Sequence, residues 1–351
     1  MITKKIKILH ILNSNSYSGA ENVVITIIKN TMDEFDSIYM SPQGNIENIL
    51  EAENINNYLV KRLTISEIKK AIKIYNPNII HAHDFRAGAL AALTGTQIPI
   101  INHLHNNVPW MRKISLYTIA YALLCLRFNK VLTVSKSVFS EFVFGGVFDY
   151  KNKIIGNPLD ASAIKRKADI CKLKEKSDII FLGRLSEQKQ PLFFLEIVKG
   201  LCLKQQSLKV EIIGDGKLRS EVDKLVANYN LESNVSVRGF LNNPYGLLAN
   251  SRVLCMPSKW EGFGLAAFEA LSLGIPVVCS GAGGLIEMVD DSCGKICHEN
   301  MADYINEIDK LLNNYQYLNM KKENALKRAE KMSNLKVYAS EIEKMYSELL
   351  G

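Results

Sequence analysis

The segment whose residue types are best suited to chemistry runs from Glu261 to Glu269 and reads Glu-Gly-Phe-Gly-Leu-Ala-Ala-Phe-Glu. Gly262 and Gly264 would let the backbone approach a ligand closely, and a helix that begins after them would direct free N–H groups at a diphosphate. Inside that helix, Glu269 is placed to accept hydrogen bonds from sugar or ribose hydroxyls. Glu261 lies in the preceding loop, nearer the reacting sugar. The alternative, two solvated surface carboxylates, fits poorly with the apolar residues between them.

Two cations, Arg184 and Lys189, stand five residues apart, after an apolar run and just before Pro191. Proline is favoured at the first position of a helix, so the two cations are expected in a strand-to-helix loop. Cations in such a loop can hold a diphosphate from two directions. Alone they would be an ordinary surface pair. Together with the acidic segment, they are predicted to stabilise a diphosphate leaving group.

Histidines occur in two pairs, His81 with His83 and His103 with His105. A metal cluster is one interpretation of four histidines close in sequence. Against it, the two pairs are assigned to different strands, and no carboxylate lies between positions 85 and 140. We therefore predict no metal site, and interpret His105 as a hydrogen-bonding group that faces a ligand cleft.

Polar and glycine-containing clusters recur just beyond the ends of predicted strands. They occupy residues 13–21, 183–184, 214–216, 257–264 and 280–284. Ligands of open parallel sheets bind beyond the carboxyl ends of the strands. One glycine loop would be weak evidence, because turns use glycine anyway. Five clusters at corresponding strand ends favour a ligand site.

Short apolar runs that predict strands alternate with longer amphipathic stretches that predict helices. The predicted strands are 6–12, 37–40, 57–60, 78–83, 98–103 and 130–134, then 178–182, 209–213, 234–238, 252–256 and 276–279. Helices are predicted at 20–31, 65–75 and 114–126. This alternation is typical of an α/β fold with parallel sheets covered on both faces.

The alternating pattern breaks between Ile154 and Asp178, where a turn precedes a charged segment that we interpret as a linker. A chain of 351 residues is long for one core, so two domains are expected. We predict Rossmann-like, doubly wound domains at 1–157 and 158–334, facing a central cleft. An amphipathic helix at 335–351 would follow and could pack back on the first domain.

Composition places the chain among globular proteins, with 47% apolar and 23% charged residues. Seven scattered cysteines without a Cys-x-x-Cys pair fit reduced thiols better than a disulfide framework. No apolar run reaches the ~18 residues that a membrane-spanning helix needs, and Lys7 and His10 interrupt the apolar N-terminal stretch. We therefore expect a soluble, cytoplasmic protein.

Positive charge is concentrated in the first half of the chain. Residues 1–156 hold 17 Lys and Arg against 11 Asp and Glu, whereas the remainder holds 26 against 25. No carboxylate lies between Asp84 and Glu141, although six Lys and Arg do. Such a surface would attract anionic lipid headgroups or a phosphorylated acceptor. A buried apolar helix with basic ends remains an equal alternative.

These motifs together resemble the retaining glycosyltransferases of the GT-B fold, in glycosyltransferase family 4, over nearly the whole chain. The motifs are Ser18-Gly19-Ala20-Glu21, Asn157-Pro-Leu-Asp160, Gly183-Arg184 with Lys189, Gly214-Asp-Gly216 and Glu261-x7-Glu269. The last, with the Arg/Lys pair, is specific to this group. Ser18 stands where the family often has a glycine. The 103–107 and 157–160 segments resemble enzymes that build capsular, exopolysaccharide or O-antigen chains.

The resemblance implies transfer of a hexose or N-acetylhexosamine from a nucleotide-diphosphate sugar, with UDP expected, and with retained anomeric configuration. The acceptor would be a saccharide or lipid-linked saccharide bound by domain 1–157, and domain 158–334 would bind the nucleotide sugar. Neither a metal nor another cofactor is implied, and no Asp-x-Asp motif is present. We expect no nucleic acid partner, and expect residues 86–136 to bring the enzyme to the cytoplasmic face of an anionic membrane.

The resemblance also assigns roles to individual residues. The residues implied in catalysis are His105, Arg184, Lys189 and Glu261, with His105 contacting the sugar near the reacting carbon. The residues implied in donor binding are Gly19, Gly183, Gly214, Phe263, Gly264, Leu265 and Glu269, the last of them at the ribose.

Two alternatives come from other functional classes. One is a nucleotide-sugar 2-epimerase on a similar two-domain scaffold, and the other is a non-catalytic sugar-binding scaffold protein. The Arg184 and Lys189 pair with the Glu261–Glu269 segment favours transfer over both. An epimerised nucleotide sugar formed without acceptor would indicate the first alternative, and absence of nucleotide release with any acceptor would indicate the second.

Overall fold

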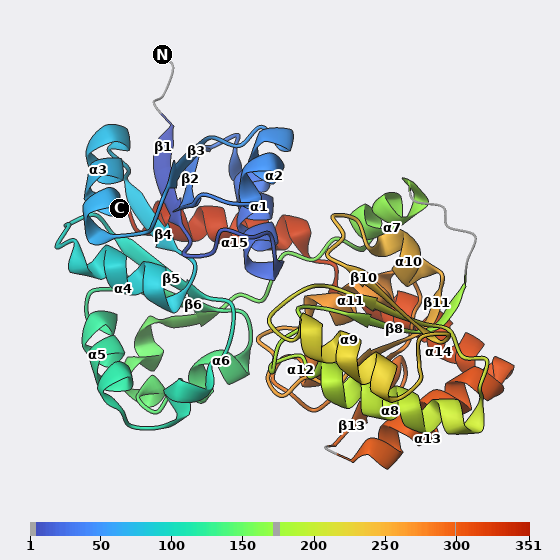
Figure 1. Cartoon of the computed structure of the whole chain (residues 1–351). Coiled ribbons are helices and arrows are strands. Elements are labelled where there is room, and N and C mark those ends of the chain that lie inside the picture. The colour runs from blue at the N-terminus through green and yellow to red at the C-terminus, as the bar shows by residue number, and fades with distance from the viewer. Residues whose placement is uncertain (1–4, 171–175, 299) are drawn as a thin grey trace. The chain divides into compact units, whose positions relative to one another are not determined.

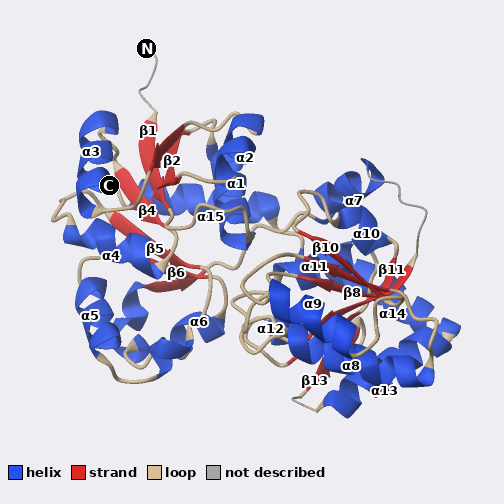
Figure 2. Ribbon diagram, viewed as in Figure 1, coloured by secondary structure: helices blue, strands red, loops and turns tan. Residues whose placement is uncertain are grey.

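A computed structural model describes residues 5–170, 176–298 and 300–351 of the chain. The chain divides into two compact units (Figure 1). Unit 1 comprises Met1–Pro158 and Asn334–Gly351, and unit 2 comprises Leu159–Ser333. Each unit is a parallel sheet with helices on both faces (Figure 2), as predicted for an α/β fold.

Unit 1 is built on a seven-stranded sheet of order β3-β2-β1-β4-β5-β6-β7, in which every pair is parallel. The strands are β1 (Ile6–Ile11), β2 (Phe35–Pro42), β3 (Asn57–Val60), β4 (Ile79–Ala82), β5 (Ile100–Leu104), β6 (Lys130–Thr133) and β7 (Asn152–Ile154). The helices are α1 (Gly19–Thr31), α2 (Ile46–Ala52), α3 (Ile65–Tyr75), α4 (Phe85–Leu93), α5 (Leu116–Cys125), α6 (Lys136–Ser140) and α15 (Leu335–Glu348). Strand order reverses between β1 and β4, which is where open parallel sheets bind ligands.

The C-terminal helix α15 belongs to unit 1, although it follows the whole of unit 2 in sequence. Figure 1 shows it in red among the blue strands and helices of this unit, and it contacts α1. Tyr346 of α15 is fully buried and meets the ring of Phe35 edge-on at 5.1 Å. Its hydroxyl lies 2.7 Å from Nδ1 of His81, so the helix is bound to the sheet by apolar and polar contacts.

Unit 2 is built on a six-stranded parallel sheet of order β10-β9-β8-β11-β12-β13. The strands are β8 (Ser177–Leu182), β9 (Val210–Ile213), β10 (Val235–Gly239), β11 (Ser251–Met256), β12 (Val277–Ser280) and β13 (Gly294–Cys297). The helices are α7 (Ala161–Ile170), α8 (Pro191–Lys204), α9 (Arg219–Asn228), α10 (Tyr245–Ala249), α11 (Leu265–Ser272), α12 (Leu285–Met288), α13 (Met301–Asn313) and α14 (Tyr315–Met332). The order here reverses between β8 and β11.

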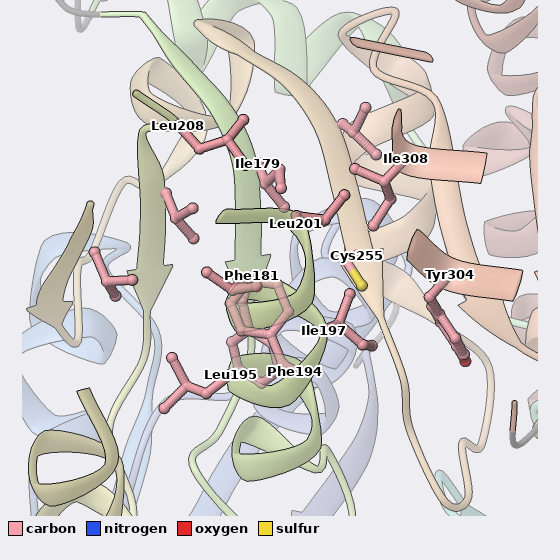
Figure 3. Close-up of a cluster of buried hydrophobic side chains, with 14 of the residues drawn as sticks. Ile179, Phe181, Phe194, Leu195, Ile197, Leu201, Leu208, Cys255, Tyr304 and Ile308 are labelled. Atoms are coloured by element: carbon pink, nitrogen blue, oxygen red, sulfur yellow. The ribbon is translucent and has the colours of Figure 1, made fainter. Parts of the chain in front are cut away.

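One face of the unit 2 sheet is covered by α8 and α13. Figure 3 shows Phe181 of β8 against Phe194 of α8, and the ring centroids lie 5.2 Å apart. Tyr304 and Ile308 of α13 pack on the same cluster and are at most 1% exposed. Burying large side chains of this kind contributes roughly 1.5–3 kcal/mol each, and it fixes the sheet whose strand ends carry the candidate site.

The charged segment after Asp160 was predicted to be a linker, and this prediction is wrong. Residues Ala161–Ile170 form α7, which contacts α10 and α11. Ala161, Ile164 and Ala168 lie on one buried face, and the amide of Ala163 donates to Oδ1 of Asp160 at 2.9 Å. Packing of three apolar residues and this cap therefore outweigh the polar composition of the segment.

Candidate functional site

The loops after β8 and β9 approach each other backbone to backbone in unit 2. Gly214 has φ +137, and a Cβ there would lie 1.9 Å from the carbonyl oxygen of Gly183. The Gly183 amide donates to the Ile213 carbonyl at 3.0 Å, and the Leu185 amide donates to the Asp215 carbonyl at 3.0 Å. Only glycine fits at 214, so the conformation of the Gly183 loop depends on it.

The loop after β8 is also bound to the loop after β11, across the point where the strand order reverses. The side-chain amide of Gln188 donates to the Trp260 carbonyl at 3.1 Å, and the Lys259 amide donates to the Gln188 carbonyl at 2.8 Å. Lys189 Nζ forms an ion pair with Oε2 of Glu261. The predicted cation and the predicted loop carboxylate are thus direct partners.

This ion pair is largely removed from solvent, with side-chain exposures of 16% for Lys189 and 11% for Glu261. Ser258 adds a longer hydrogen bond, with its Oγ 3.4 Å from Oε2 of Glu261. Separating the two side chains would leave an uncompensated charge away from water, which is unfavourable. The ion pair therefore holds the Lys189 and Glu261 side chains in position. Arg184, by contrast, is exposed, and no hydrogen bond or ion pair of its guanidinium is recorded within the described residues.

Helix α11 begins at Leu265, directly after Gly264, as predicted. The glycines after β12 pack beneath the loop that precedes the helix. Gly283 has φ +51, and a Cβ there would lie 1.8 Å from the carbonyl oxygen of Glu261. The Gly284 amide donates to that same carbonyl at 3.2 Å. The cluster at 280–284 therefore supports the Glu261 loop, and the start of α11 offers N–H groups at the same edge of the sheet.

Glu269 lies inside α11 and is partly buried. Burial raises its pKa from 4.5 to about 7, and the hydrogen bond from Tyr245 and the charges of Lys167 and Lys189 oppose this rise. The Tyr245 hydroxyl lies 3.0 Å from Oε1. The carboxyl can therefore exist in either protonation state near neutral pH and accepts hydrogen bonds in the ionised one.

In unit 1, Gly19 is the exposed first residue of α1, after the loop that follows β1. Ser18 stands at the N-cap position, and its hydroxyl donates to the carboxylate of Glu21 and not to a backbone N–H of the helix. Asp84, after β4, accepts from the Asn13 amide at 2.8 Å and caps α4. Burial raises the pKa of Asp84. These contacts fix the loops on either side of the reversal point in unit 1.

Five of the six histidines of the chain gather on one face of the unit 1 sheet. They are His10, His81, His83, His103 and His105. Register explains this, because His10 of β1 pairs with His81 of β4. His83 and His105 lie just beyond the ends of β4 and β5, two residues after His81 and His103. Residues two apart on a strand share a face, so neighbouring strands bring all five rings together.

The two histidine pairs do belong to different strands, as predicted, but β4 and β5 are neighbours, so this difference does not keep the pairs apart. Nitrogens of His10, His81 and His83 lie within 4.8 Å of one another, and so do those of His83, His103 and His105. Imidazole suits zinc, copper or nickel, so either triad could hold such an ion after ring rotation. Burial lowers the pKa of His10 and His105 to about 3 and that of the other three well below the usual range. The rings are therefore neutral at physiological pH.

The structure thus places the predicted residues in two sets, one in each unit. The set in unit 2, at the ends of β8, β9 and β11, is Gly183, Arg184, Lys189, Gly214, Glu261, Phe263, Gly264, Leu265 and Glu269. The set in unit 1, at the ends of β1 and β5, is Gly19 and His105.

Partners of the predicted residues were missed from sequence. Tyr245 lies 24 positions before Glu269, and no local pattern indicates the contact. His10 is a polar residue within the otherwise mostly apolar strand β1. This interruption was the sequence feature that could have indicated a role for His10 in the site.

Helix α5 is exposed on its apolar side, which decides between the two interpretations of the basic region. Leu116, Tyr117 and Leu123 are 84%, 78% and 63% exposed, and only Thr118, Tyr121 and Cys125 are buried. A buried apolar helix with basic ends is therefore excluded. No helix within the described residues has the length and apolarity to cross a bilayer.

Two doubly wound parallel-sheet units of this kind are the architecture of the GT-B glycosyltransferases. Anabaena HepE, solved with UDP and glucose, superposes with a TM-score of 0.85 over 97% of this chain and 99% of its own, at 20% identity. Residues 18–163 match the family model "Glycosyltransferase Family 4", and residues 163–328 match "Glycosyl transferases group 1". The chain is thus composed of a glycosyltransferase family 4 domain followed by a glycosyl transferases group 1 domain.

Two bacterial relatives align over most of the chain. The O-antigen biosynthesis glycosyltransferase WclY of Escherichia coli is 24% identical over 329 residues, covering 90% of this chain and 91% of its own. The UDP-Gal:alpha-D-GlcNAc-diphosphoundecaprenol alpha-1,3-galactosyltransferase of Escherichia coli is 27% identical over 347 residues, covering 88% of this chain and 87% of its own.

Proposed function

We propose that the chain transfers a hexose or N-acetylhexosamine from a UDP-sugar to a saccharide or lipid-linked saccharide, retaining the anomeric configuration, in cell-surface polysaccharide biosynthesis. The observation that carries the proposal is the largely buried Lys189–Glu261 ion pair between two glycine loops and the start of α11. The relatives named for O-antigen synthesis and for galactosyl transfer to a diphosphoundecaprenol acceptor support it. So does the UDP complex of the HepE structure.

In this proposal the chain neutralises the leaving group without a metal. Breaking the bond at the anomeric carbon leaves negative charge on the departing diphosphate. Lys189 is held over Gly183, where a Cβ would touch its methylenes at 3.5 Å, and the exposed Arg184 adds a second cation from the same loop. Such preorganised donors act where charge develops. Gly214 keeps this loop in position.

The donor contacts follow the same division between the two units. Glu261, with Phe263 and Gly264, holds the sugar and phosphate, and Leu265 begins the helix whose amides face them. Glu269 accepts from the ribose hydroxyls. From unit 1, Gly19 approaches the diphosphate through its backbone, and His105 contacts the sugar near the reacting carbon.

The test is turnover of a UDP-sugar by Lys189→Ala and Arg184→Ala enzymes. Each substitution is expected to lower the transfer rate about 10²–10³-fold, because one donor to the leaving group is lost. Lys259→Ala is the matched control, since its exposed side chain lies two residues from Glu261 and is expected to have little effect. If both site variants fold and retain rates within a few-fold of wild type, the assignment is wrong.

A thermal-shift screen of UDP-, GDP- and ADP-sugars addresses the donor directly. A ligand at 100 times its dissociation constant stabilises the folded state by about 2.7 kcal/mol. Stabilisation by UDP-sugars alone is expected. Product analysis with and without acceptor then separates transfer from 2-epimerisation.

We further propose that the surface formed by α5 and the residues before it docks on an anionic membrane. Ile114, Leu116, Tyr117 and Leu123 project apolar side chains, and the exposed Arg112 and Lys113 adjoin them. Apolar side chains flanked by cations are the pattern of helices that lie in a membrane interface. A diphosphoundecaprenol acceptor, as named for one relative, would be presented at such a surface.

Liposome sedimentation tests this docking. Wild-type protein is expected to sediment with vesicles that contain anionic lipid and to stay in solution with neutral ones. The double substitution Leu116→Ser, Leu123→Ser should abolish sedimentation. Leu203→Ser is the control, because Leu203 is 82% exposed on α8 of unit 2. Equal binding to both kinds of vesicle, or none, contradicts the proposal.

A further inference from the structure

Asn102 is a polar side chain that lies fully buried within β5, against Gly88 of α4. Its Nδ2 donates to the carbonyl oxygens of Ala82, at 3.3 Å, and of Asp84, at 3.0 Å. Its Oδ1 accepts from the Tyr121 hydroxyl at 2.6 Å. Because backbone carbonyls can only accept, the surroundings determine the orientation of the amide, and both of its polar atoms have partners.

Helix α4 leaves room for this amide at a glycine. A Cβ at Gly88 would lie 2.4 Å from Nδ2 and 2.7 Å from Oδ1 of Asn102. Gly88 lies inside the helix, where glycine is destabilising relative to alanine. The missing side chain therefore weakens the helix and admits the Asn102 amide to the turn after β4.

The two carbonyls that Asn102 contacts lie on either side of His83, where β4 ends. Nδ1 of His83 lies 3.1 Å from Nε2 of His105, the residue predicted to contact the sugar. The carboxylate of Asp84 accepts from the Asn13 amide at 2.8 Å, in the loop that precedes α1. One buried amide therefore holds the turn that contacts both His105 and the loop before α1.

Tyr121 anchors this amide from helix α5, which contacts α4 (Figure 1). It is on the buried side of α5, and its ring meets Phe85 edge-on at 5.1 Å. Phe85 is the first residue of α4, directly after Asp84. Helix α5 therefore holds the start of α4 by a ring contact and the turn before it through the hydrogen bond to Asn102.

We propose that Asn102, anchored by Tyr121, is a positioning residue for the proposed transfer reaction. It sets the turn after β4, and through that turn the place of His105 and of the loop before α1. Small displacements of groups that orient a substrate can lower a rate strongly, even when the altered residue is remote from the chemistry. The kinetic role rests on the proposed function, whereas the hold on the turn is a property of the chain itself.

A methyl exchange separates hydrogen bonding from packing at this position. Asn102→Ala removes the amide and leaves a cavity, which destabilises unit 1. Adding Gly88→Ala to the same chain puts a methyl group into that space and a better helix former into α4. The double variant should therefore recover part of the urea midpoint that Asn102→Ala loses. It cannot restore the hydrogen bonds to the turn.

Steady-state kinetics and amide exchange then measure the positioning. In the single and the double variant, kcat should fall about 10–10²-fold, because the turn is no longer held. KM for the UDP-sugar should change less than about threefold, because the contacts assigned to unit 2 are intact. Exchange of the Asn13 amide should be about tenfold faster than in the wild-type protein, since its acceptor on Asp84 is less firmly placed.

The matched control makes the same kind of exchange in unit 2. A Cβ at Gly200 of α8 would lie 2.4 Å from Cδ1 of Ile305 on α13. Gly200→Ala with Ile305→Val therefore replaces one methyl group by another between two helices. This variant should change neither kcat nor exchange of the Asn13 amide.

Two results would overturn the proposal. If kcat of the double variant returns to within about twofold of wild type, Asn102 only fills space. If kcat falls but the Asn13 amide exchanges as in the wild-type protein, the effect does not pass through the turn after β4. A wild-type protein that transfers no sugar contradicts the proposed function alone, and the exchange of Asn13 still decides whether Asn102 holds the turn.

Tyr121→Phe provides the decision if the double variant does not fold. It removes one hydroxyl and leaves the Asn102 amide without its donor. Both changes, in kcat and in Asn13 exchange, are then expected in the same direction but only about threefold in size. Wild-type values of both in Tyr121→Phe would overturn the proposal.

Discussion

The carboxyl edges of the two sheets share a topology, but their buried ionisable side chains are stabilised in different ways. In unit 2, Lys189 and Glu261 form an ion pair in which each is the other's counter-ion. In unit 1, the clustered histidines have no carboxylate partner among the residues that the structure describes, and burial leaves them neutral. Buried ionisable groups must be either paired or uncharged, and the two edges show one solution each.

This difference indicates what each edge can bind. A paired lysine beside helix N–H groups is suited to a ligand that gains negative charge, as a departing diphosphate does. Neutral imidazoles offer directional donors and acceptors without a strong field, which suits sugar hydroxyls. Glu269 lies between these cases, because it is partly buried, forms no salt bridge with another described residue, and has its pKa raised by burial to about 7.

The largest effect on stability is expected in unit 2, where the backbone at Gly283 packs closely against the Glu261 loop. Gly283→Ala would place a Cβ 1.8 Å from the Glu261 carbonyl at φ +51. We expect a loss of at least about 3 kcal/mol in the unfolding free energy of unit 2, from the left-handed backbone and the clash. Urea unfolding followed by Trp260 fluorescence in a Trp110→Phe background measures it, since the chain has two tryptophans, one in each unit.

Gly95→Ala is the matched control, because Gly95 has φ +72 but no atom within 4 Å of an added Cβ. It should cost only about 1 kcal/mol, and only in unit 1. If both variants lose the same unfolding free energy, the steric clash at Gly283 adds nothing to the cost of the left-handed backbone conformation.

A smaller effect is expected from the titration of Glu269. If its carboxylate accepts from the ribose, UDP affinity should rise about tenfold from pH 6 to pH 8, as the group with pKa about 7 ionises. Folding should respond in the opposite direction. The folded state holds the proton more tightly than the unfolded state, so stability falls as pH rises from about 4.5 to about 7.

Isothermal titration with UDP and urea unfolding across this range measure both slopes. Glu269→Gln should flatten both, because its side chain does not titrate. A wild-type affinity that is the same at pH 6 and pH 8 would remove Glu269 from the ribose contact.

The sequence was sufficient for most of the sheet architecture, because buried parallel strands are short, nearly continuous apolar runs. Two strands were missed, β7 and β13, which read Asn-Lys-Ile and Gly-Lys-Ile-Cys. Both are edge strands with few apolar residues. They form because they pair with a neighbouring strand, and their own sequences show no strand pattern. Helix α7 was missed because its three buried residues, Ala161, Ile164 and Ala168, are interspersed with polar and charged residues in the sequence.

The two edges also differ in how far their chemistry could be predicted. Around Glu261 and Glu269 the important relations are local, since a glycine loop and a helix start lie in one segment. The ion pair between Lys189 and Glu261 follows from their places after β8 and β11. The histidine cluster depends on which strands are neighbours, and on α15 returning to unit 1 to place Tyr346 against His81. Neither relation can be read from spacing.

The smallest effect on stability is expected from the polar contact between α15 and the histidine cluster of unit 1. Tyr346→Phe removes the hydroxyl that lies 2.7 Å from His81 Nδ1 and should lower the stability of unit 1 by about 1 kcal/mol. Tyr338→Phe on the same helix is the control, because its buried hydroxyl has no hydrogen-bond partner in the described part of the chain. That change should be neutral or stabilising, since it relieves an unpaired buried polar group. Urea midpoints from Trp110 fluorescence compare the two, and equal losses would show that His81 gains nothing from Tyr346.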